Sequence, residues 1–208
     1  MGKILLIGGG GHARVLIDLI RSLGKYEIVG ILDPQLEKGS AVLGVSVLGG
    51  DRVLKGLYDQ KAKNACIGIG SVNSNEKRRS LYERVSEIGF RVPELIHPKS
   101  IVSNESKIAG GVQVMAGAII QANTFIDQNT IINTGAVVDH DCIVGKHVHI
   151  CPGAVISGGC IIGDGAFIGV GSMVIQGVKI GKGTLIAAGS VVLKNVPDGA
   201  TVKGVPAK

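Results

Sequence analysis

His140 and Asp141 are neighbouring residues whose side chains are suited to proton transfer near neutral pH. An imidazole has a pKa near neutrality, so it can accept and release a proton under physiological conditions. A carboxylate beside it can orient the ring and stabilise its charged form. The alternative is that His140 is an exposed histidine at a turn of the chain, without a chemical role.

His147 and His149 follow soon after this pair, and three cysteines lie in the same region. The histidines do not predict a zinc site, because no third and fourth ligand stands at a suitable spacing, so we expect no metal. Cys142, Cys151 and Cys160 suggest a covalent acyl-cysteine as one alternative. Buried core thiols are favoured, because Cys142 and Cys160 fall where Ala and Ser also occur in the pattern described next.

A six-residue repeat runs from Ile101 to Val196 without an insertion. A period of six fits neither an α-helix nor the alternation of a simple strand, but it fits a short strand followed by a corner. Three blocks would close one triangular coil, and coils would stack about 4.8 Å apart. Sixteen blocks then give about five coils, enough for a stable solenoid. The second residue of every block is Ile or Val: Val102, Ile108, Val114, Ile120, Ile126, Ile132, Val138, Val144, Ile150, Ile156, Ile162, Ile168, Val174, Ile180, Ile186 and Val192.

The fifth and sixth residues of each block predict the corners. Glycine and asparagine tolerate a positive φ, as a corner requires. The fifth residue is mostly glycine, at 111, 117, 135, 153, 159, 165, 171, 177, 183 and 189, or asparagine, at 123, 129 and 195. Asp141 and His147 depart from this rule, and such departures tend to occur at functional sites. The sixth residue is small or slim, as in Ala118, Thr124, Ala136, Cys142, Ala154 and Ser172.

Residues 1–97 have a different pattern, which predicts a Rossmann-like α/β domain. An apolar strand over 3–7 runs into four glycines and His12, and the next segment has helical spacing up to Gly24. Strands are expected over 26–32, 64–70 and 90–96, with an amphipathic helix over 75–89. A strand, glycine loop, helix and strand in this order form a parallel βαβ unit.

The glycine loop predicts a phosphate site. Gly8, Gly10 and Ala13, with Asp33 twenty residues after Ala13, match the dinucleotide fingerprint, but the domain is half the length of a full dinucleotide domain. Backbone N–H groups at a helix N-terminus can bind a phosphate, and Asp33 can accept a hydrogen bond from a ribose or a base. The alternative is a tight strand-to-helix turn that needs glycine.

Composition argues against other classes. The net charge is +6, the basic residues are scattered, and aromatic residues make up 3% with no Trp, which argues against nucleic-acid binding. No apolar stretch reaches the length of a membrane span, and the first residues are too short for a signal peptide. Since the four cysteines form no CxxC pair, we expect reduced thiols and a cytoplasmic location.

Four segments, GGGGHARVLID, LIHPKSIVS, VVDHDCIVGKHVHICPGA and KGVPAK, give the chain a family resemblance. Together they resemble the bacterial sialic acid O-acetyltransferases and UDP-amino-sugar N-acetyltransferases, which are hexapeptide-repeat acyltransferases. The resemblance implies a left-handed parallel β-helix over 98–196 that binds acetyl-CoA, a tail over 197–208, and a small domain that binds the nucleotide sugar. It also implies a homotrimer with active sites between neighbouring prisms. Apolar residues at the first position of the blocks are either trimer contacts or ordinary corner packing: Ile119, Phe125, Ile131, Val137 and Ile143.

The same resemblance implies roles for individual residues. His140 is the expected catalytic base, with Asp141 beside it. Because the cysteines are expected to be core thiols, acetyl is expected to pass directly to the acceptor. His149 is expected at the thioester end of acetyl-CoA, as a donor to the carbonyl oxygen. The other expected CoA contacts are Gly158, Val170, Ala188 and Lys194, and the expected nucleotide-sugar contacts are Gly10, Gly11, His12 and Asp33. Pro34 and Gln35 replace an acidic residue and a lysine found in several relatives, which leaves base recognition open.

The expected function is an acetyl-CoA-dependent sugar acetyltransferase of glycan or polysaccharide synthesis. N-acetylation of a UDP-linked amino sugar is favoured over O-acetylation of sialic acid, because a free sugar has no pyrophosphate for the glycine loop. The alternatives from other classes are a nicotinamide-dependent reductase and a non-catalytic trimeric scaffold.

Overall fold

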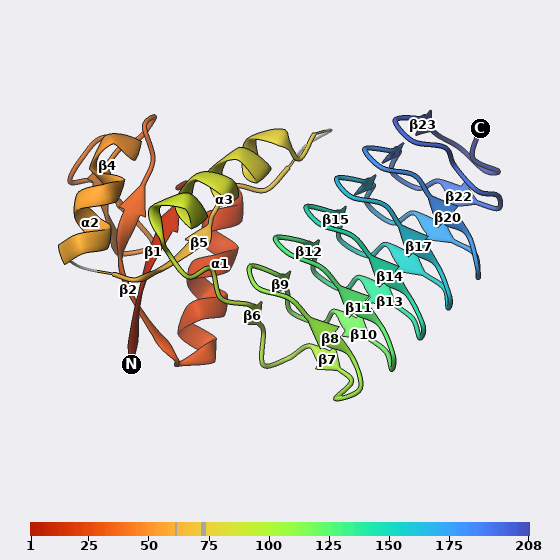
Figure 1. Cartoon of the computed structure of the whole chain (residues 1–208), viewed down its shortest axis with the longest axis horizontal. Helices are drawn as coiled ribbons and strands as arrows, with labels where there is room; N and C mark the ends of the chain where they lie inside the picture. The colour runs from red at the N-terminus through yellow and green to blue at the C-terminus, as the bar shows by residue number, and fades with distance from the viewer. Residues whose placement is uncertain (61, 72–73) are drawn as a thin grey trace. The chain divides into compact units, whose positions relative to one another are not determined.

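The computed structural model describes residues 1–60, 62–71 and 74–208. The chain divides into two compact units (Figure 1). Of the described residues, the α/β unit comprises those within Met1–Ser71 and Lys77–Leu95, and the β-helix unit comprises residues 74–76 and Ile96–Lys208.

The α/β unit is built on a five-stranded sheet in the order β3-β4-β2-β1-β5. The apolar run near the N-terminus forms β1 (Gly2–Ile7), which pairs in parallel with β2 (Tyr26–Leu32) and β5 (Asn64–Ile67). Helix α1 (Gly11–Leu23) joins β1 to β2, and Gly24, with a φ of 66°, is its left-handed C-cap. The predicted βαβ unit is therefore present.

Several elements of this unit differ from the sequence expectation. An antiparallel hairpin of β3 (Ala41–Val42) and β4 (Val45–Gly49), a 3-10 helix η1 (Asp51–Val53) and helix α2 (Leu54–Gln60) were not predicted. Helix α3 (Glu76–Ile88) occupies the predicted helical range. The strand expected over 90–96 is wrong, because Arg91 makes one isolated bridge to Asn64 and only Leu95–Ile96 forms a strand, β6.

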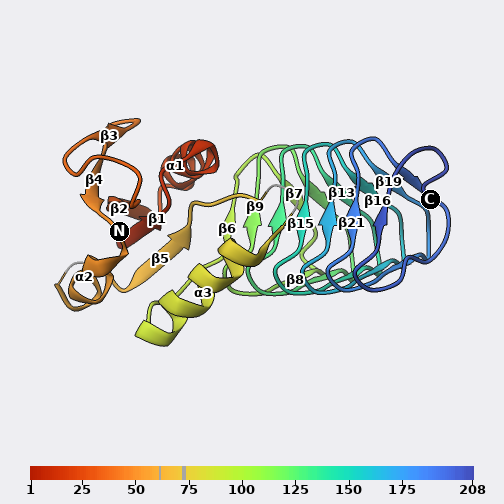
Figure 2. The same ribbon diagram turned by 90° about the horizontal axis from the view of Figure 1, so that it is seen from above.

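The β-helix unit confirms the six-residue period as a stack of two-residue strands on three faces (Figure 2). The β13 face contains β7 (Ile101–Val102), β10 (Ile119–Ile120), β13 (Val137–Val138), β16 (Val155–Ile156), β19 (Met173–Val174) and β22 (Val191–Val192). The β14 face contains β8 (Lys107–Ile108), β11 (Phe125–Ile126), β14 (Ile143–Val144), β17 (Ile161–Ile162) and β20 (Lys179–Ile180). The β15 face contains β6, β9 (Gln113–Val114), β12 (Ile131–Ile132), β15 (His149–Ile150), β18 (Phe167–Ile168), β21 (Leu185–Ile186) and β23 (Thr201–Val202). Because β6 lies six residues before β7, the period begins one block earlier than predicted.

Side chains at the second position of the blocks fill the prism. Those of the middle coils, from Val114 to Val192, are at most 2% exposed, and the slim sixth-position residues are buried among them. The ten predicted glycines, Asn123 and Asn129 have positive φ, as do Asp141 and His147. The expectation is wrong at Asn195, where the chain leaves the six-residue spacing and the side-chain oxygen accepts the Lys179 N–H at 2.8 Å.

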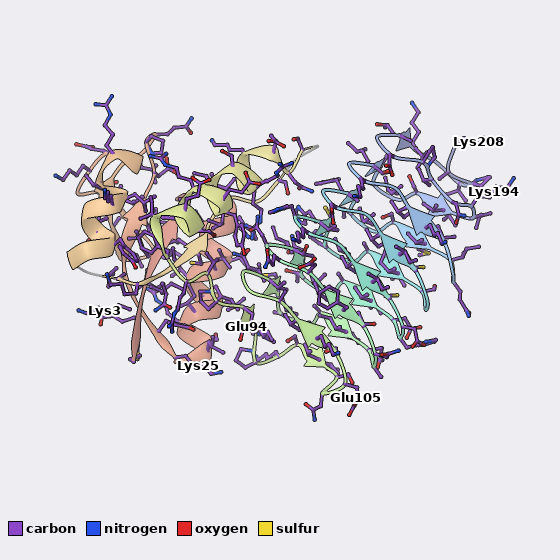
Figure 3. All side chains as sticks on the ribbon, in the orientation of Figure 1. Lys3, Lys25, Glu94, Glu105, Lys194 and Lys208 are labelled. Atoms are coloured by element: carbon purple, nitrogen blue, oxygen red, sulfur yellow. The ribbon has the colours of Figure 1, made fainter. Side chains whose placement is uncertain are left out.

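The final residues of the chain pair with the last rung of each face. Strand β23 pairs with β21, Val196 bridges to Ile180, and the N–H of Ala207 donates to the Val191 carbonyl at 2.8 Å. Figure 3 shows Lys194 and Lys208 at this end of the prism and Glu105 at the other. Residues 197–208, expected as a tail, thus contain a strand of the β15 face.

Candidate active site

His140 lies in the corner that links β13 to β14. Its Nδ1 lies 2.7 Å from Oδ2 of Asp141, and its backbone N–H donates to Oδ1 of Asp139 at 2.9 Å. Oδ1 of Asp141 accepts a hydrogen bond from the Asn123 amide at 2.6 Å. The positive φ of Asp141, 60°, is the corner geometry that the repeat requires at its fifth position.

The electrostatics of this corner favour a basic imidazole. The hydrogen bond to Asp141 and the charge of Asp139 raise the pKa of His140 above its usual range. The hydrogen bonds from Asn123 and His140 lower the pKa of Asp141. An ionised Asp141 accepts the proton on Nδ1, so the hydrogen-bond network assigns the free lone pair of neutral His140 to Nε2. That nitrogen is suited to take a proton from an acceptor group.

Gly158 provides the surface on which the His140 ring lies. A Cβ at position 158 would lie 2.6 Å from Cε1 and Nε2 of His140. The two residues are stacked one coil apart, because the Gly159 N–H donates to the His140 carbonyl at 2.9 Å. Glycine at position 158 therefore leaves the space that the imidazole ring of His140 occupies.

The residues expected to bind CoA lie on two edges of the prism. Gly158 lies on the edge that carries His140, and Lys194 lies two coils further along the same edge. Val170 and Ala188 lie on the edge between the β15 and β13 faces, stacked through a 2.8 Å bond from the Gly189 N–H to the Val170 carbonyl. These two edges lie on either side of the β13 face. Within a single copy of the chain, the expected CoA contacts therefore do not form one continuous site.

His149 lies elsewhere, at the start of β15. Its side chain is 5% exposed, its Nε2 lies 3.0 Å from the Asn133 amide, and its ring packs edge-on against Phe167 at 5.3 Å. In a three-sided prism the β15 face is opposite the edge that carries His140. The structure therefore does not bring His140 and His149 together within one chain.

Two asparagines were not singled out from the sequence. Asn123 contacts Asp141 and Asn133 contacts His149. For Asn123 a signal was available, since it stands three blocks before Asp141 and stacked corners repeat every three blocks. A surface hollow beside this corner is lined by Glu105, Lys107, Asn123, Thr124, Phe125, Asp141 and Ile143.

The cysteines are all buried and free. Cys142 donates its S–H to the Ser157 carbonyl at 3.3 Å, and Cys160 donates to the Ile175 carbonyl at 3.2 Å. An acyl-cysteine intermediate would need a thiol that the acyl donor can reach. Burial therefore supports a packing role for these side chains.

The glycine loop of the α/β unit contains two kinds of glycine. A Cβ at Gly8, whose φ is 103°, would lie 2.6 Å from the Ile69 side chain, and a Cβ at Gly9 would lie 2.5 Å from the Leu36 side chain, so both glycines are closely packed. A Cβ at Gly10 or Gly11 would meet nothing within 4 Å. Gly10 is the N-cap of α1 and no side chain caps this end, so backbone N–H groups are available to an anion.

The remaining predicted residues of this unit surround the loop. His12 lies in the first turn of α1, and a Cβ at Gly70 would lie 3.3 Å from the Cβ of His12. Oδ2 of Asp33 accepts the Gly9 N–H and its Oδ1 accepts the Gln35 N–H, each at 2.8 Å. Asp33 thus holds the loop in place. A small hollow at the carboxyl ends of β1, β2 and β5 is lined by Ile7, Gly8, Leu32, Asp33, Pro34, Gln35, Ile69, Lys77 and Leu81.

Comparison with known proteins identifies relatives of both units. The family described as "PglD N-terminal domain" matches residues 3–85, and "Bacterial transferase hexapeptide (six repeats)" matches residues 159–194. A histidine-to-asparagine variant of perosamine N-acetyltransferase from Caulobacter crescentus, solved with CoA and GDP-perosamine, is 41% identical with a TM-score of 0.94, over 100% of this chain and 96% of that one. The chain belongs to the family of hexapeptide-repeat sugar acetyltransferases.

Two other relatives agree with this assignment to the sugar acetyltransferase family. The acetyltransferase domain of PglB from Neisseria gonorrhoeae FA1090, solved with acetyl coenzyme A, is 39% identical with a TM-score of 0.92, over 99% of this chain and 98% of that one. GDP-perosamine N-acetyltransferase from Escherichia coli O157:H7 is 32% identical over 153 residues, which are 71% of this chain and 66% of that protein.

Membership of the family confirms the expected fold class, an α/β N-terminal domain followed by a left-handed β-helix, and the expected enzyme class, an acetyltransferase. The reductase and scaffold alternatives lose their support, because the relatives that match this chain over 99–100% of its length are acetyltransferases. In the described residues we find no cluster of three or more His, Cys, Asp or Glu side chains arranged to hold a metal. Nor does any described helix have the length and apolarity needed to cross a bilayer.

Proposed function

We propose that this chain transfers acetyl from acetyl-CoA to the amino group of a nucleotide-linked amino sugar, with His140 as the general base. The observation that carries the proposal is the pairing of His140 Nδ1 with Asp141 at 2.7 Å, which leaves Nε2 as the proton acceptor. The acetyltransferase relatives with CoA or acetyl-CoA bound support the choice of acyl donor.

The chemistry is a direct transfer. The sugar nitrogen attacks the thioester carbonyl, a C–N bond forms, and the C–S bond to CoA breaks. Nε2 of His140 takes the proton that the nitrogen loses, Asp141 stabilises the imidazolium, and that proton is returned to the departing CoA thiolate. The products are the N-acetyl sugar nucleotide and free CoA.

The nucleotide-sugar site is proposed at the glycine loop. The open space at Gly10 and Gly11, the uncapped start of α1 and the adjacent His12 suit a pyrophosphate. Asp33 and Gln35 line the neighbouring hollow, where a base would be recognised. The expectation of a uridine nucleotide stays a prediction, and GDP-perosamine is the first acceptor to test because relatives at 41% and 32% identity are named for it.

We also propose that the protein acts as a homotrimer in the cytoplasm. Three apolar side chains form an exposed column on the β14 face: Phe125 (37% exposed), Ile143 (50%) and Ile161 (39%). A second copy that covers this column would bring two edges together, the edge that carries Gly158 from one copy and the edge that carries Val170 from the other. Together these edges would complete a CoA site. His149 would meet His140 only across such an interface. The free cysteines are consistent with a reducing compartment.

A thiol-release assay with acetyl-CoA tests the function. GDP-perosamine, UDP-linked amino sugars and sialic acid are offered separately, and mass spectrometry detects acetylated product. Release of the CoA thiol with a nucleotide-linked amino sugar supports the proposal if the His140→Ala variant no longer releases it. No release with any acceptor overturns the activity, and release with sialic acid alone overturns N-acetylation. Light scattering during size exclusion measures the oligomer, and a monomer would overturn the trimer.

A further inference from the structure

Asn123 and Asp141 occupy equivalent corners of successive coils. Their backbones share the left-handed conformation, with φ of 57° and 60°, and the Asp141 N–H donates to the Ala122 carbonyl at 3.1 Å. The amide of Asn123 donates to Oδ1 of Asp141 at 2.6 Å, while Oδ2 faces His140. Each carboxylate oxygen thus has one side-chain partner.

We infer that Asn123 is a positioning residue for His140, acting through Asp141. The inference rests on the proposed role of His140 as the base. The Asp141 side chain is 54% exposed, so water competes for its oxygens and the terminal torsion of a free aspartate is broad. With one oxygen bound by the Asn123 amide, the carboxylate keeps the orientation that presents Oδ2 to Nδ1 of His140.

The position of the proton gives this bond its chemical importance. A carboxylate held against Nδ1 keeps the neutral imidazole in the tautomer whose Nε2 accepts a proton. A carboxylate that turns away lets the ring rotate and lets the proton move to Nε2, and that tautomer cannot act as a base at this nitrogen. Asn123 thereby selects the reactive form of a residue that it does not touch.

Stacked corner side chains also occur where no base is proposed. The Asn129 amide lies 2.9 Å from Nδ1 of His147, again one coil away, and Asn129 has a φ of 56°. Corner asparagines thus pair across coils at two places, Asn123 and Asn129, and such pairing alone supports only a structural role. This pair, in which the asparagine is buried rather than exposed, supplies a control for the Asn123 variants.

The surroundings decide the pH response. His140 faces Asp141 and Asp139 in its own corner, while Glu105 and Lys107 line the hollow next to Asn123 and Asp141. The coil on the other side contributes Gly158, which carries no charge. The carboxylates of Asp141 and Asp139 raise the pKa of the His140 ring. A change that lets Asp141 move away from the ring therefore lowers that pKa, and an added carboxylate raises it.

Two substitutions at 123 test the inference. Asn123→Gly removes the amide and keeps the positive φ, as the stacked Gly159 and Gly177 do. We expect kcat to fall about tenfold or more with the KM for acetyl-CoA unchanged, and the acidic limb of kcat/KM to shift to lower pH. Asn123→Asp places a second carboxylate beside Asp141, so its acidic limb shifts to higher pH. Asn129→Gly is the control, with unchanged pH dependence.

The outcomes separate this inference from the proposed function. Full turnover in His140→Ala would overturn the base itself. Loss of turnover in His140→Ala, with the wild-type kcat and pH profile in both Asn123 variants, would overturn the positioning role alone. Shifts of the same sign in both variants, or an equal kcat loss in Asn129→Gly, would show a merely structural effect and overturn it too. Nitrogen NMR of His140 adds a direct readout, with Nδ1–H expected in the wild type and a tautomer mixture in Asn123→Gly.

Discussion

The imidazole of His140 lies on the Cα of Gly158, where a methyl group would come within 2.6 Å of the ring. Gly158→Ala therefore displaces the ring and leaves the coil in place, because the clashing atoms belong to an exposed side chain that can swing away. We expect kcat to fall about 10- to 100-fold with little change in Tm. Steady-state kinetics and thermal melting check this, and unchanged kcat would show that the ring position is unimportant.

Gly163→Ala is the stability counterpart. A Cβ there would lie 2.6 Å from the Lys182 backbone nitrogen, and the backbone of the next coil cannot swing aside. We expect about 1–3 kcal/mol lower stability, as in overpacked cores, measured by denaturant unfolding. A destabilisation no larger than that of Gly158→Ala would contradict the distinction between backbone and side-chain contacts.

Asp141→Asn should keep the corner and lose the charge. Asparagine tolerates the positive φ at this position, but it does not stabilise an imidazolium as a carboxylate does. We expect kcat to fall about 100-fold and the acidic limb to move to lower pH. Circular dichroism controls for folding, and wild-type turnover would rule out a role for the carboxylate.

The pH profile of the wild type follows from the raised pKa of His140. A general base works unprotonated, so kcat/KM should fall as the pH decreases through that pKa, which lies above the ordinary value of about 6.5. The carboxylates of Asp141 and Asp139 are the cause. An acidic limb below that value would contradict the assignment of His140 as the group that titrates.

Gly10→Ala probes the phosphate site. The backbone at Gly10 has a φ of −78°, which alanine adopts, and its Cβ would point into open space. We expect unchanged Tm and an unchanged KM for acetyl-CoA, but a KM for the nucleotide sugar about tenfold higher. If neither KM changes, the loop is only a strand-to-helix turn.

The β-helix was readable from the sequence because each block carries its own geometry. A β-branched residue at 126 or 150 must point inward and a glycine at 153 must turn the corner, so local rules repeat without dependence on distant residues. The corner rule failed at Asn195, where the chain leaves the six-residue spacing at the end of the prism and the residue has no positive φ. They also missed β6, because Leu95 lies within a segment that the α/β pattern could equally claim.

The site was less predictable, because its contacts join residues that are distant in sequence. The position of Asp33 at the end of a strand predicted a hydrogen bond to a ribose or a base. In the structure its two carboxylate oxygens accept hydrogen bonds from the backbone N–H groups of Gly9 and Gln35. The distribution of Gly158 and Val170 over two edges depends on how three blocks wrap into one coil. The Asn123 amide bond depends on the same wrapping, which no single block encodes.

The pairing of the last rungs with residues 196–207 has a consequence for assembly. A stack of parallel strands with open backbone groups at its end is a template for adding another such stack, and identical prisms could grow into a fibre. Here β21 is covered by β23, Ile180 by Val196, and Val191 by Ala207. Val196 and Ala207 thereby occupy the backbone positions of Ile180 and Val191 to which the strands of a second prism would otherwise add.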